Sequence, residues 1–582
     1  MCIGGSPRAS GRMTPASQSL IAGVKPELGE TIVSSETFLG GDPVGALLFI
    51  TAVSLPIAVI LSLLILHLYQ RAVARLMQAT AVARTPAGPA AAAEPVRATL
   101  PAEPPPFALQ VMDEDAAPLV SDEARRRLAQ TRHSALRAAA IYAVAGSAHA
   151  MVATIVLFVS SDTEFLPLRT SFVWFILAWP IVPTVFFVAV GSRRIRGIGI
   201  AAYFFVALAI SPVSWIELAT LWGTFMGVPT LLLIAVGHRR LRAVGPLVLV
   251  ATFLVVIGAN LALTAAFSAG FVLAAAVVAG FIALAWWTVQ WIAERYRRKR
   301  MSDLGLTLDA WWLLFTLWEC LDFSAAEGLG GAFVLAAFAV YKLVLALGFR
   351  LISPSEPRSV LSLLLLRVFG FRKRSERLLD ELGHKWRYAG PVNLISAPDL
   401  ATGYVEPHEF LDYLAGRLSR TFVKSASDLE TRLTTLDRTP DPDGRYRVNE
   451  FFCHADTWQP TMRRLAQKSD AILMDLRSFS RDNRGCAYEL RELLDGVPVD
   501  RIVLVIDATT DRALLEAMLR DMWRTLAPTS PNLAPQQRAL RIFLIKSRSS
   551  RAIDKLLLAL FVSDAQQSPE VSGTAVAEPF TC

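Results

Sequence analysis

Blocks of about 20 apolar residues, repeated between positions 45 and 352, constrain this chain more than any other feature, because about 20 such residues let a helix cross a bilayer. Outside these blocks the sequence has ordinary globular or loop character. The hydrophobic content of 53% is therefore concentrated in one half of the chain. This distribution predicts a membrane protein with a separate soluble part rather than one large soluble core.

Nine membrane spans are predicted from the apolar blocks. They cover residues 45–69, 138–159, 171–190, 198–214, 218–236, 244–265, 271–292, 307–323 and 332–352. The first span stands alone, and the other eight form a transmembrane domain over 138–352. Residues 1–44 are predicted to be a flexible N-terminal segment. Residues 70–137, rich in alanine and proline, are predicted to be a disordered linker with one short helix near Ser121–Arg132.

The loops between the spans predict the orientation, because arginine and lysine accumulate on the cytoplasmic side. Linker 70–137 holds nine arginines, and the turns at Arg193–Arg196, Arg239–Arg242 and Arg295–Arg300 are basic. The alternate turns are nearly bare of basic residues. We therefore expect a cell-membrane protein, in a bacterium an inner-membrane one, with its N-terminus outside and its C-terminus in the cytoplasm.

The net charge of +8 does not indicate a nucleic-acid partner, because much of the excess is arginine in short loops that set topology. The lipid bilayer is the expected partner instead. The five cysteines show neither metal-ligand spacing nor a disulfide framework, so no metal site is predicted.

Lys342 and Glu319 are ionisable residues inside predicted spans, where charge is costly. On adjacent helices they are expected to form a polar pair. Such a pair either belongs to a path for an ion or substrate, or simply holds two helices together. The second interpretation is favoured, because a transporter would more often show several such residues or broken helices in matched halves.

Past Pro354 the pattern changes to short apolar runs that alternate with amphipathic helical stretches. The runs are Val360–Val368, Val392–Ser396, Ala471–Leu476, Arg501–Ile506 and Leu540–Ile545. Continuous apolar strands separated by helices predict a flavodoxin-like α/β domain, a doubly wound parallel sheet, over residues 356–565. Residues 421–456 are predicted to be an insertion before the third strand, and 566–582 a disordered tail.

Charged residues follow the ends of the predicted strands, where doubly wound folds bind their ligands. They are Arg367, Asp399, Asp475, Arg477 and Asp507. Arginine on phosphate and carboxylate on ribose hydroxyls could hold a nucleotide, although charged residues are also common at such turns as helix caps. The Gly-rich phosphate loops of Rossmann dehydrogenases and P-loop NTPases are absent.

The stretch from Ser469 to Ile506 resembles a Toll/interleukin-1 receptor (TIR) domain. A strand there ends in a serine-containing loop, a helix opens with Cys486-Ala487-Tyr488-Glu489, and the next strand follows. Asp456-Thr457-Trp458 upstream also resembles the family. In enzymatic TIR domains the glutamate of that helix cleaves NAD at the nicotinamide–ribose bond, so the resemblance implies this role for Glu489, with NAD as substrate. It also implies self-association through the domain.

Three classes of function remain open at this point. The leading one is a membrane-anchored signalling or defence protein whose TIR-like domain acts by association or by NAD cleavage. The second is a transporter or channel with a regulatory cytoplasmic domain. The third is a membrane scaffold whose α/β domain has no catalytic site.

Overall fold

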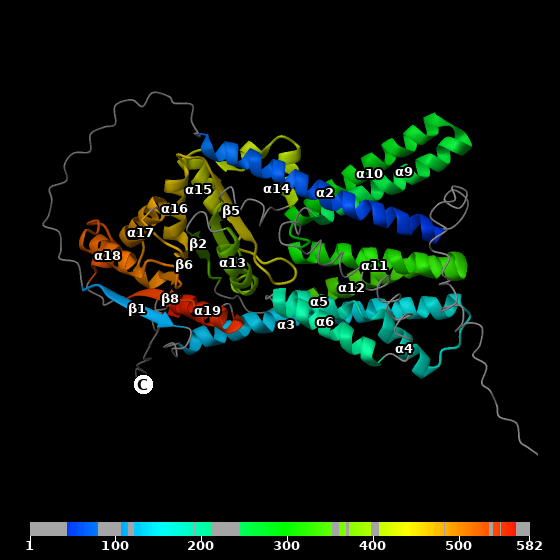
Figure 1. The fold of residues 1–582 in the computed structure, drawn as a ribbon, viewed down its shortest axis with the longest axis horizontal. Coiled ribbons are helices and arrows are strands. Elements are labelled where there is room, and N and C mark those ends of the chain that lie inside the picture. Colours follow the sequence, from blue (N-terminus) through cyan, green and yellow to red (C-terminus); the bar gives the residue numbers. More distant parts are fainter. Residues whose placement is uncertain are drawn as a thin grey trace, which may run out of the picture.

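The computed structural model has two parts, a bundle of long helices and an eight-stranded parallel sheet covered by shorter helices (Figure 1). The predicted N-terminal segment up to residue 42 and the predicted tail 566–582 lie outside the described residues. The structure describes residues 43–79, 106–113, 121–190, 193–210, 245–351, 360–367, 372–396, 407–481, 483–534, 539–547 and 549–565.

The sheet contains all five strands that the sequence predicts. In space they follow the order β3-β2-β6-β7-β8, and each neighbouring pair is parallel. Their inner residues are mostly apolar and buried, with Asn393 and Arg541 as the polar exceptions, which is why they read as apolar runs. The strands are β2 (Leu363–Arg367), β3 (Val392–Ile395), β6 (Ala471–Asp475), β7 (Ile502–Ile506) and β8 (Ala539–Leu544).

Three further strands extend the sheet at its two edges. β1 (Ala108–Asp113) pairs with β8, although it lies in the segment predicted to be a disordered linker. β5 (Val448–Cys453) pairs with β3, and the two-residue β4 (Phe422–Val423) pairs with β5. The insertion at 421–456 therefore widens the sheet instead of standing apart from it.

Helices cover both faces of the sheet, and alternate residues of each strand point to opposite cores. On one face, Leu364 and Leu504 pack under α15, α16, α17 and α18. On the other, Leu363 and Val503 pack under α13, α19 and the first turns of α3. These helices are α13 (Arg372–Trp386), α15 (Ala426–Thr434), α16 (Trp458–Lys468), α17 (Arg484–Gly496), α18 (Arg512–Arg524) and α19 (Ser550–Ala565).

Among the described residues of the bundle, five helices are long and apolar enough to cross a membrane, or six if one bent pair counts as a single span. The bent pair joins α4 and α5 at an angle of 47°. The bundle helices are α2 (Pro43–Gln78), α3 (Asp122–Ser160), α4 (Pro167–Leu177), α5 (Ile181–Ala189), α6 (Arg193–Ile210), α9 (Gly245–Ala269), α10 (Phe271–Arg297), α11 (Asp303–Glu327) and α12 (Leu335–Leu351).

The count of nine spans stays a prediction. The predicted span 218–236 lies outside the described residues. Neither α6 nor α11 is among the helices that are long and apolar enough to cross a membrane. α11 carries five carboxylates, and most of its described residues are buried. It therefore lies inside the bundle, against neighbours that can partner its charges.

α2 and α3 are too long to serve the bundle alone. They contain 36 and 39 residues. At a rise of 1.5 Å per residue, each is more than 50 Å long, against about 30 Å of hydrocarbon core. In Figure 1 both run on from the bundle along the α/β part. The predicted short helix near Ser121–Arg132 is thus the first part of α3, which continues unbroken into the bundle.

Specific contacts fix these two helices to the α/β part. Tyr69 of α2 meets Tyr413 edge to face, with ring centroids 5.3 Å apart. The carbonyl of Leu76 lies 2.7 Å from His454 Nδ1. Arg132 of α3 forms an ion pair with Asp554 of α19 at 2.6 Å. Two continuous helices therefore tie the bundle to the sheet.

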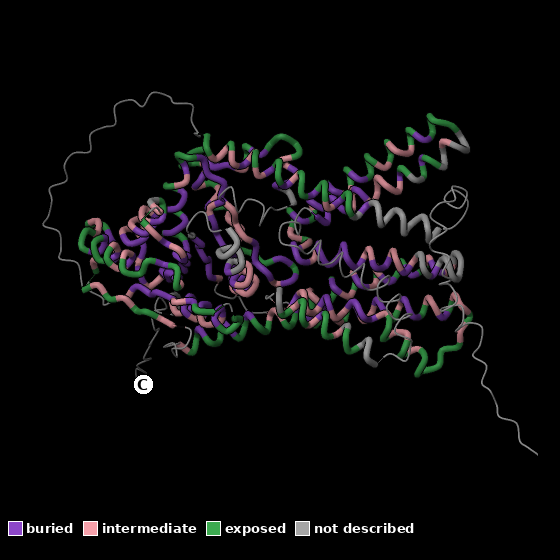
Figure 2. Tube along the Cα trace, viewed as in Figure 1, coloured by how far each residue is buried: buried purple, intermediate pink, exposed green. Residues whose placement is uncertain are grey.

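Large apolar side chains are distributed very differently over the two parts. Among the described residues, those with substantial exposure lie on the bundle helices and their connections, and the only two others are Val111 and Leu414. Figure 2 shows exposed residues along the outer sides of the bundle. Exposed apolar surface on this scale is unusual for a protein surrounded by water. The bundle surface therefore suits a lipid environment.

Candidate functional site

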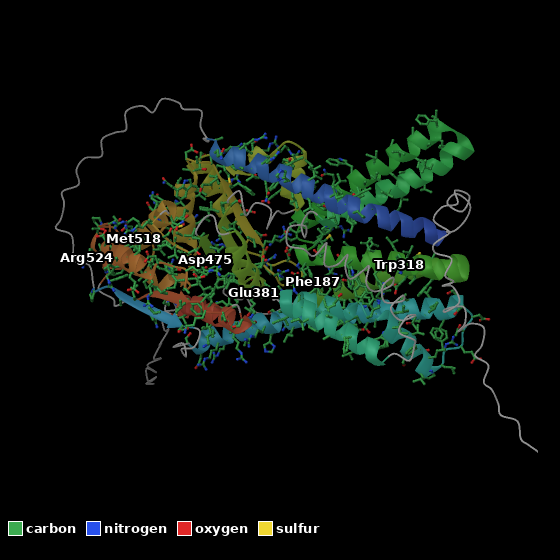
Figure 3. The ribbon with its side chains drawn as sticks, in the orientation of Figure 1. Phe187, Trp318, Glu381, Asp475, Met518 and Arg524 are labelled. Atoms are coloured by element: carbon green, nitrogen blue, oxygen red, sulfur yellow. The ribbon has the colours of Figure 1, made fainter. Side chains whose placement is uncertain are left out.

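The predicted strand-end residues Asp475 and Arg477 meet directly. Arg477 donates to both carboxylate oxygens of Asp475, from Nε at 2.8 Å and from Nη2 at 2.7 Å, and both side chains are buried. Ser478 follows with φ of 64°, which turns the chain sharply away from the sheet. Asp475 lies at the end of β6 in the α/β part, well separated from Trp318 of the bundle (Figure 3).

Asp507 belongs to the neighbouring loop, after β7. Its Oδ1 accepts from the backbone N–H of Thr509 at 2.9 Å and from the Thr509 hydroxyl at 2.5 Å. That hydroxyl lies 2.7 Å from Ser478 Oγ, so the loops after β6 and β7 are joined. Three predicted site residues therefore lie together at the carboxyl ends of the strands. The carboxylates of Asp475 and Asp507 accept hydrogen bonds from neighbouring residues of these loops.

The structure says less of the other two strand-end residues. Arg367 is the register partner of Asp475 in the β2–β6 pair, which places its backbone at the same edge. Asp399 lies outside the described residues. Among the described residues, no group of histidine, cysteine or carboxylate side chains could hold a metal ion.

Glu489 lies on the inner side of α17. It is 3% exposed, and Cys486 and Leu490 of the same helix belong to the core beneath it. Glu492, three residues on, instead forms a two-pronged ion pair with Arg463, with both distances 2.7 Å, and that arginine lowers its pKa. On the same helix, Glu489 is thus buried whereas Glu492 lies closer to the surface.

The expected partnership between Lys342 and Glu319 is wrong. Lys342 Nζ lies 2.5 Å from Asp309 Oδ2 on α11. Glu319 Oε2 lies 3.6 Å from His149 Nε2 of α3. Ten residues of helix separate Asp309 from Glu319, which is about 15 Å along the axis, so one lysine cannot reach both. Both pairs link neighbouring helices, which fits the interpretation that they hold the bundle together.

A buried charge cluster at the junction of the two parts was not predicted. Asp303 begins α11 and receives two hydrogen bonds from Arg387, at 2.8 and 3.1 Å. Arg445 Nη1 lies 3.6 Å from the same carboxylate. Arg447 donates to Asp441 at 3.0 and 3.2 Å. All of these residues are at most 9% exposed. We call this set, with Asp443, the junction cluster.

Further contacts hold the junction cluster to the bundle. Arg447 donates to the carbonyl of Tyr296 at 2.5 Å, and its guanidinium lies 3.8 Å from the centroid of the Tyr296 ring. Lys299 forms an ion pair with Asp437 at 2.5 Å. Burial raises the pKa of Asp441 to about 6 even though Arg447 opposes this shift, and burial also raises the pKa of Asp443. In the sequence these residues belong to the run Pro440-Asp-Pro-Asp-Gly-Arg-Tyr-Arg447, inside the predicted insertion at 421–456.

A cavity of about 1240 Å³ lies beside the junction cluster. Its walls come from α3, α9, α10, α11 and α12, and from the loop at residues 438–446 of the α/β part. Lys342 and Asp309 line it, together with Asp441 and Asp443. It is therefore bounded by both parts of the molecule.

No protein-family model matches the chain, and neither a curated protein nor a solved structure matches it. The functional interpretation therefore rests on the residues and their geometry.

Proposed function

We propose that this chain is a multi-pass membrane protein whose flavodoxin-like, TIR-like domain acts at the cytoplasmic face in signalling or defence. The observation that carries the proposal is the contrast between a bundle with outward apolar side chains and an α/β part whose apolar side chains are almost all inside. The proposal includes the nine spans and the outward N-terminus predicted from the apolar blocks and the basic turns.

The position of the α/β part supports its assignment to the cytoplasm. It contacts the C-terminal end of α10 and the N-terminal end of α11, where the basic run Arg295–Arg300 lies. The turn between α3 and α4, poor in basic residues, is at the opposite end of α3 from its contacts with α19. Positive loops stay in the cytoplasm during insertion. The α/β part is thus attached at the positive end of the bundle.

The strand order supports a flavodoxin-like core. Numbered along the chain, the five predicted strands lie in the order 2-1-3-4-5, with the added strands at the outside. In this arrangement the order in which strands are added to the sheet reverses between the parallel neighbours β2 and β6. Ligands of such folds bind outside the carboxyl ends of the strands at that point. Arg367 and Asp475 end those two strands side by side. A TIR-like domain would bind its ligand at the carboxyl ends of these two strands.

Catalysis, if the TIR-like domain has it, would require Glu489. NAD cleavage breaks the bond between the nicotinamide nitrogen and the ribose, and water adds to the ribose carbon. A carboxylate lowers the barrier by stabilising the oxocarbenium-like centre that forms. Glu489 is buried on the side of α17 that faces the core, so substrate would have to reach it through the loops at the carboxyl ends of the strands. Self-association of the domain is the natural trigger for such an opening.

NAD consumption by the purified full-length chain tests this activity. We expect NAD to be converted to nicotinamide and ADP-ribose when the protein is clustered in vesicles. Glu489→Gln should abolish the conversion. Glu492→Gln, which alters a carboxylate on the surface of the same helix, should leave it intact.

Two results would count against a catalytic role. One is NAD that stays intact with clustered wild-type protein, which would leave association as the means of signalling. The other is equal activity in the wild type and Glu489→Gln. Loss of folded protein in Glu489→Gln is separated from loss of activity by measuring its thermal unfolding beside that of Glu492→Gln.

A further inference from the structure

The cavity beside the junction cluster combines a basic rim with an apolar interior. We propose that it binds one anionic phospholipid of the bilayer, with the phosphate of the headgroup at the rim and the acyl chains along the bundle helices. This inference does not depend on any activity of the TIR-like domain.

The rim carries more positive than negative charge. Five lining arginines are exposed, whereas the three lining carboxylates already contact cations or backbone N–H groups of the protein: Asp309 meets Lys342, Asp441 meets Arg447, and Asp443 accepts from the backbone of Arg445. Guanidinium groups form strong, two-pronged hydrogen bonds with phosphate. The rim therefore selects an anionic group. The exposed arginines are Arg137, Arg295, Arg300, Arg350 and Arg438.

The interior is built from apolar side chains of the bundle helices. Such a wall suits acyl chains and does not suit a small hydrophilic anion. The lining residues include Ile141, Val250, Leu306, Leu313, Phe338 and Leu343. Leu343 is 58% exposed and Trp291 is 44% exposed, so the cavity reaches the outer surface of the bundle, where lipid would enter.

The position of the cavity along the bundle also corresponds to the headgroup level of a bilayer. Trp291 is exposed near the C-terminal end of α10, and the Arg295 guanidinium lies 4.3 Å from its ring centroid. Exposed tryptophan followed by arginine is typical of the level of the lipid headgroups. The rim arginines Arg295 and Arg300 therefore lie where a lipid phosphate is found. Basic pockets between helices on the cytoplasmic side bind such headgroups.

The bound lipid would contact both parts of the molecule. Pro440, Pro442 and Gly444 of the α/β loop line the cavity beside the bundle side chains. Gly444 has φ of 81°, so the loop turns tightly at this wall. An occupant would consequently reinforce the junction as well as fill the cavity.

The test compares lipid retention by purified full-length protein. The protein is offered equal amounts of phosphatidylglycerol and phosphatidylcholine with identical acyl chains, and bound lipid is counted by native mass spectrometry. We expect retention of one phosphatidylglycerol in preference to phosphatidylcholine. The double variant Arg295→Gln, Arg300→Gln should reduce this preference about thirtyfold, since each basic residue near anionic lipid contributes about 1 kcal/mol.

A matched control lies on the same helix end. Arg297 and Arg298 pair with Glu294 and do not line the cavity. The double variant Arg297→Gln, Arg298→Gln removes the same charge and should keep the preference. Equal losses in the two double variants would show only general attraction to a charged surface and would overturn the proposal.

Other outcomes are equally decisive. Equal retention of the two lipids by the wild-type protein would overturn the proposal. Displacement of phosphatidylglycerol by inorganic phosphate would show a site for a free anion and would also overturn it. If the cavity variant does not fold, hydrogen exchange of residues 438–446 in the wild type decides: protection by phosphatidylglycerol but not by phosphatidylcholine supports the site, and equal exchange contradicts it.

Discussion

The bundle and the α/β part differ in where their apolar side chains lie. In the α/β part they fill two cores on either side of the sheet, and Leu414 is its one strongly exposed large hydrophobic residue among the described positions after 351. In the bundle, leucine, phenylalanine and tryptophan point outward along α2, α4, α10 and α12. The difference is what the proposed membrane location requires, with lipid around the bundle and water around the α/β part.

The two parts also differ in how they hold charge. On the outside of the α/β part, pairs such as Arg463–Glu492 are partly exposed. At the junction, three arginines and three aspartates are buried together. A buried ion pair that loses one partner leaves a costly unpaired charge. The junction is therefore the place where a single substitution should do the most damage.

Removing the carboxylate of Asp303 should have the largest effect. Asp303→Ala leaves Arg387 and Arg445 buried without their shared partner, which should cost about 3–5 kcal/mol. Hydrogen exchange of residues 440–446 measures the opening of the junction. Glu294→Ala, which removes an exposed carboxylate at the end of α10, should change this exchange little. Similar effects of the two substitutions would contradict the structural role of the cluster.

A lysine in place of an exposed leucine should distinguish the two solvents. Leu284 in the middle of α10 is 41% exposed, and Leu414 in the α/β part is 45% exposed. In lipid the change Leu284→Lys should cost about 3 kcal/mol of insertion free energy, whereas Leu414→Lys faces water and should cost almost nothing. The fraction of chain recovered in membranes measures both. Equal recovery would show that α10 does not face lipid.

Acidification should tighten the junction through Asp441. Its pKa is raised from 3.8 to about 6, so the folded form holds the proton more strongly than the unfolded form. This contribution is fully present below about pH 4 and is lost as the pH rises through about 6, with a size on the order of 1–3 kcal/mol. Exchange of residues 440–446, corrected for its intrinsic pH dependence, should be slower at about pH 5.5 than at about pH 7.5.

Two variants check the source of this pH dependence. Asp441→Asn should remove much of it, and the raised pKa of Asp443 should supply the remainder with the same sign. An opposite trend, with a looser junction in acid, would contradict the raised pKa of the two carboxylates Asp441 and Asp443.

The surface pair on α16 and α17 should matter least. Arg463→Ala removes the partner of Glu492, and because Arg463 is half exposed, water screens the charge that remains. The expected loss is about 0.2–1 kcal/mol in the free energy of unfolding. Thermal unfolding of the variant beside the wild type measures it. A loss as large as that of Asp303→Ala would remove the distinction between surface and junction charge.

The sequence predicted the five central strands because each is a mostly apolar run with at most one polar residue in its interior. It missed β4 because two residues carry no pattern, and it missed β5 because Asn449 and Glu450 interrupt the run. β1 follows a proline-rich stretch, and its side chains are half exposed, so neither composition nor periodicity marks it. Pairing with β8 is what makes it a strand.

The sequence also could not predict which residues from distant segments contact each other. Hydropathy located Lys342 and Glu319 in spans but could not set the relative height of the two helices, and Asp309 was passed over as the partner. The junction cluster joins α11 to a turn more than a hundred residues later. Of the strand-end residues, Asp475, Arg477 and Asp507 could be grouped in advance because parallel strands end at one edge.

The orientation of the two parts across a membrane is the central claim, and cysteine labelling tests it most directly. In a background without the native cysteines, Glu164→Cys marks the turn between α3 and α4, and Ser427→Cys marks the surface of α15; both positions are exposed. A membrane-impermeant maleimide should label Glu164→Cys in intact cells and Ser427→Cys only after permeabilisation. Labelling of both positions in intact cells, or the reverse pattern, would contradict the account.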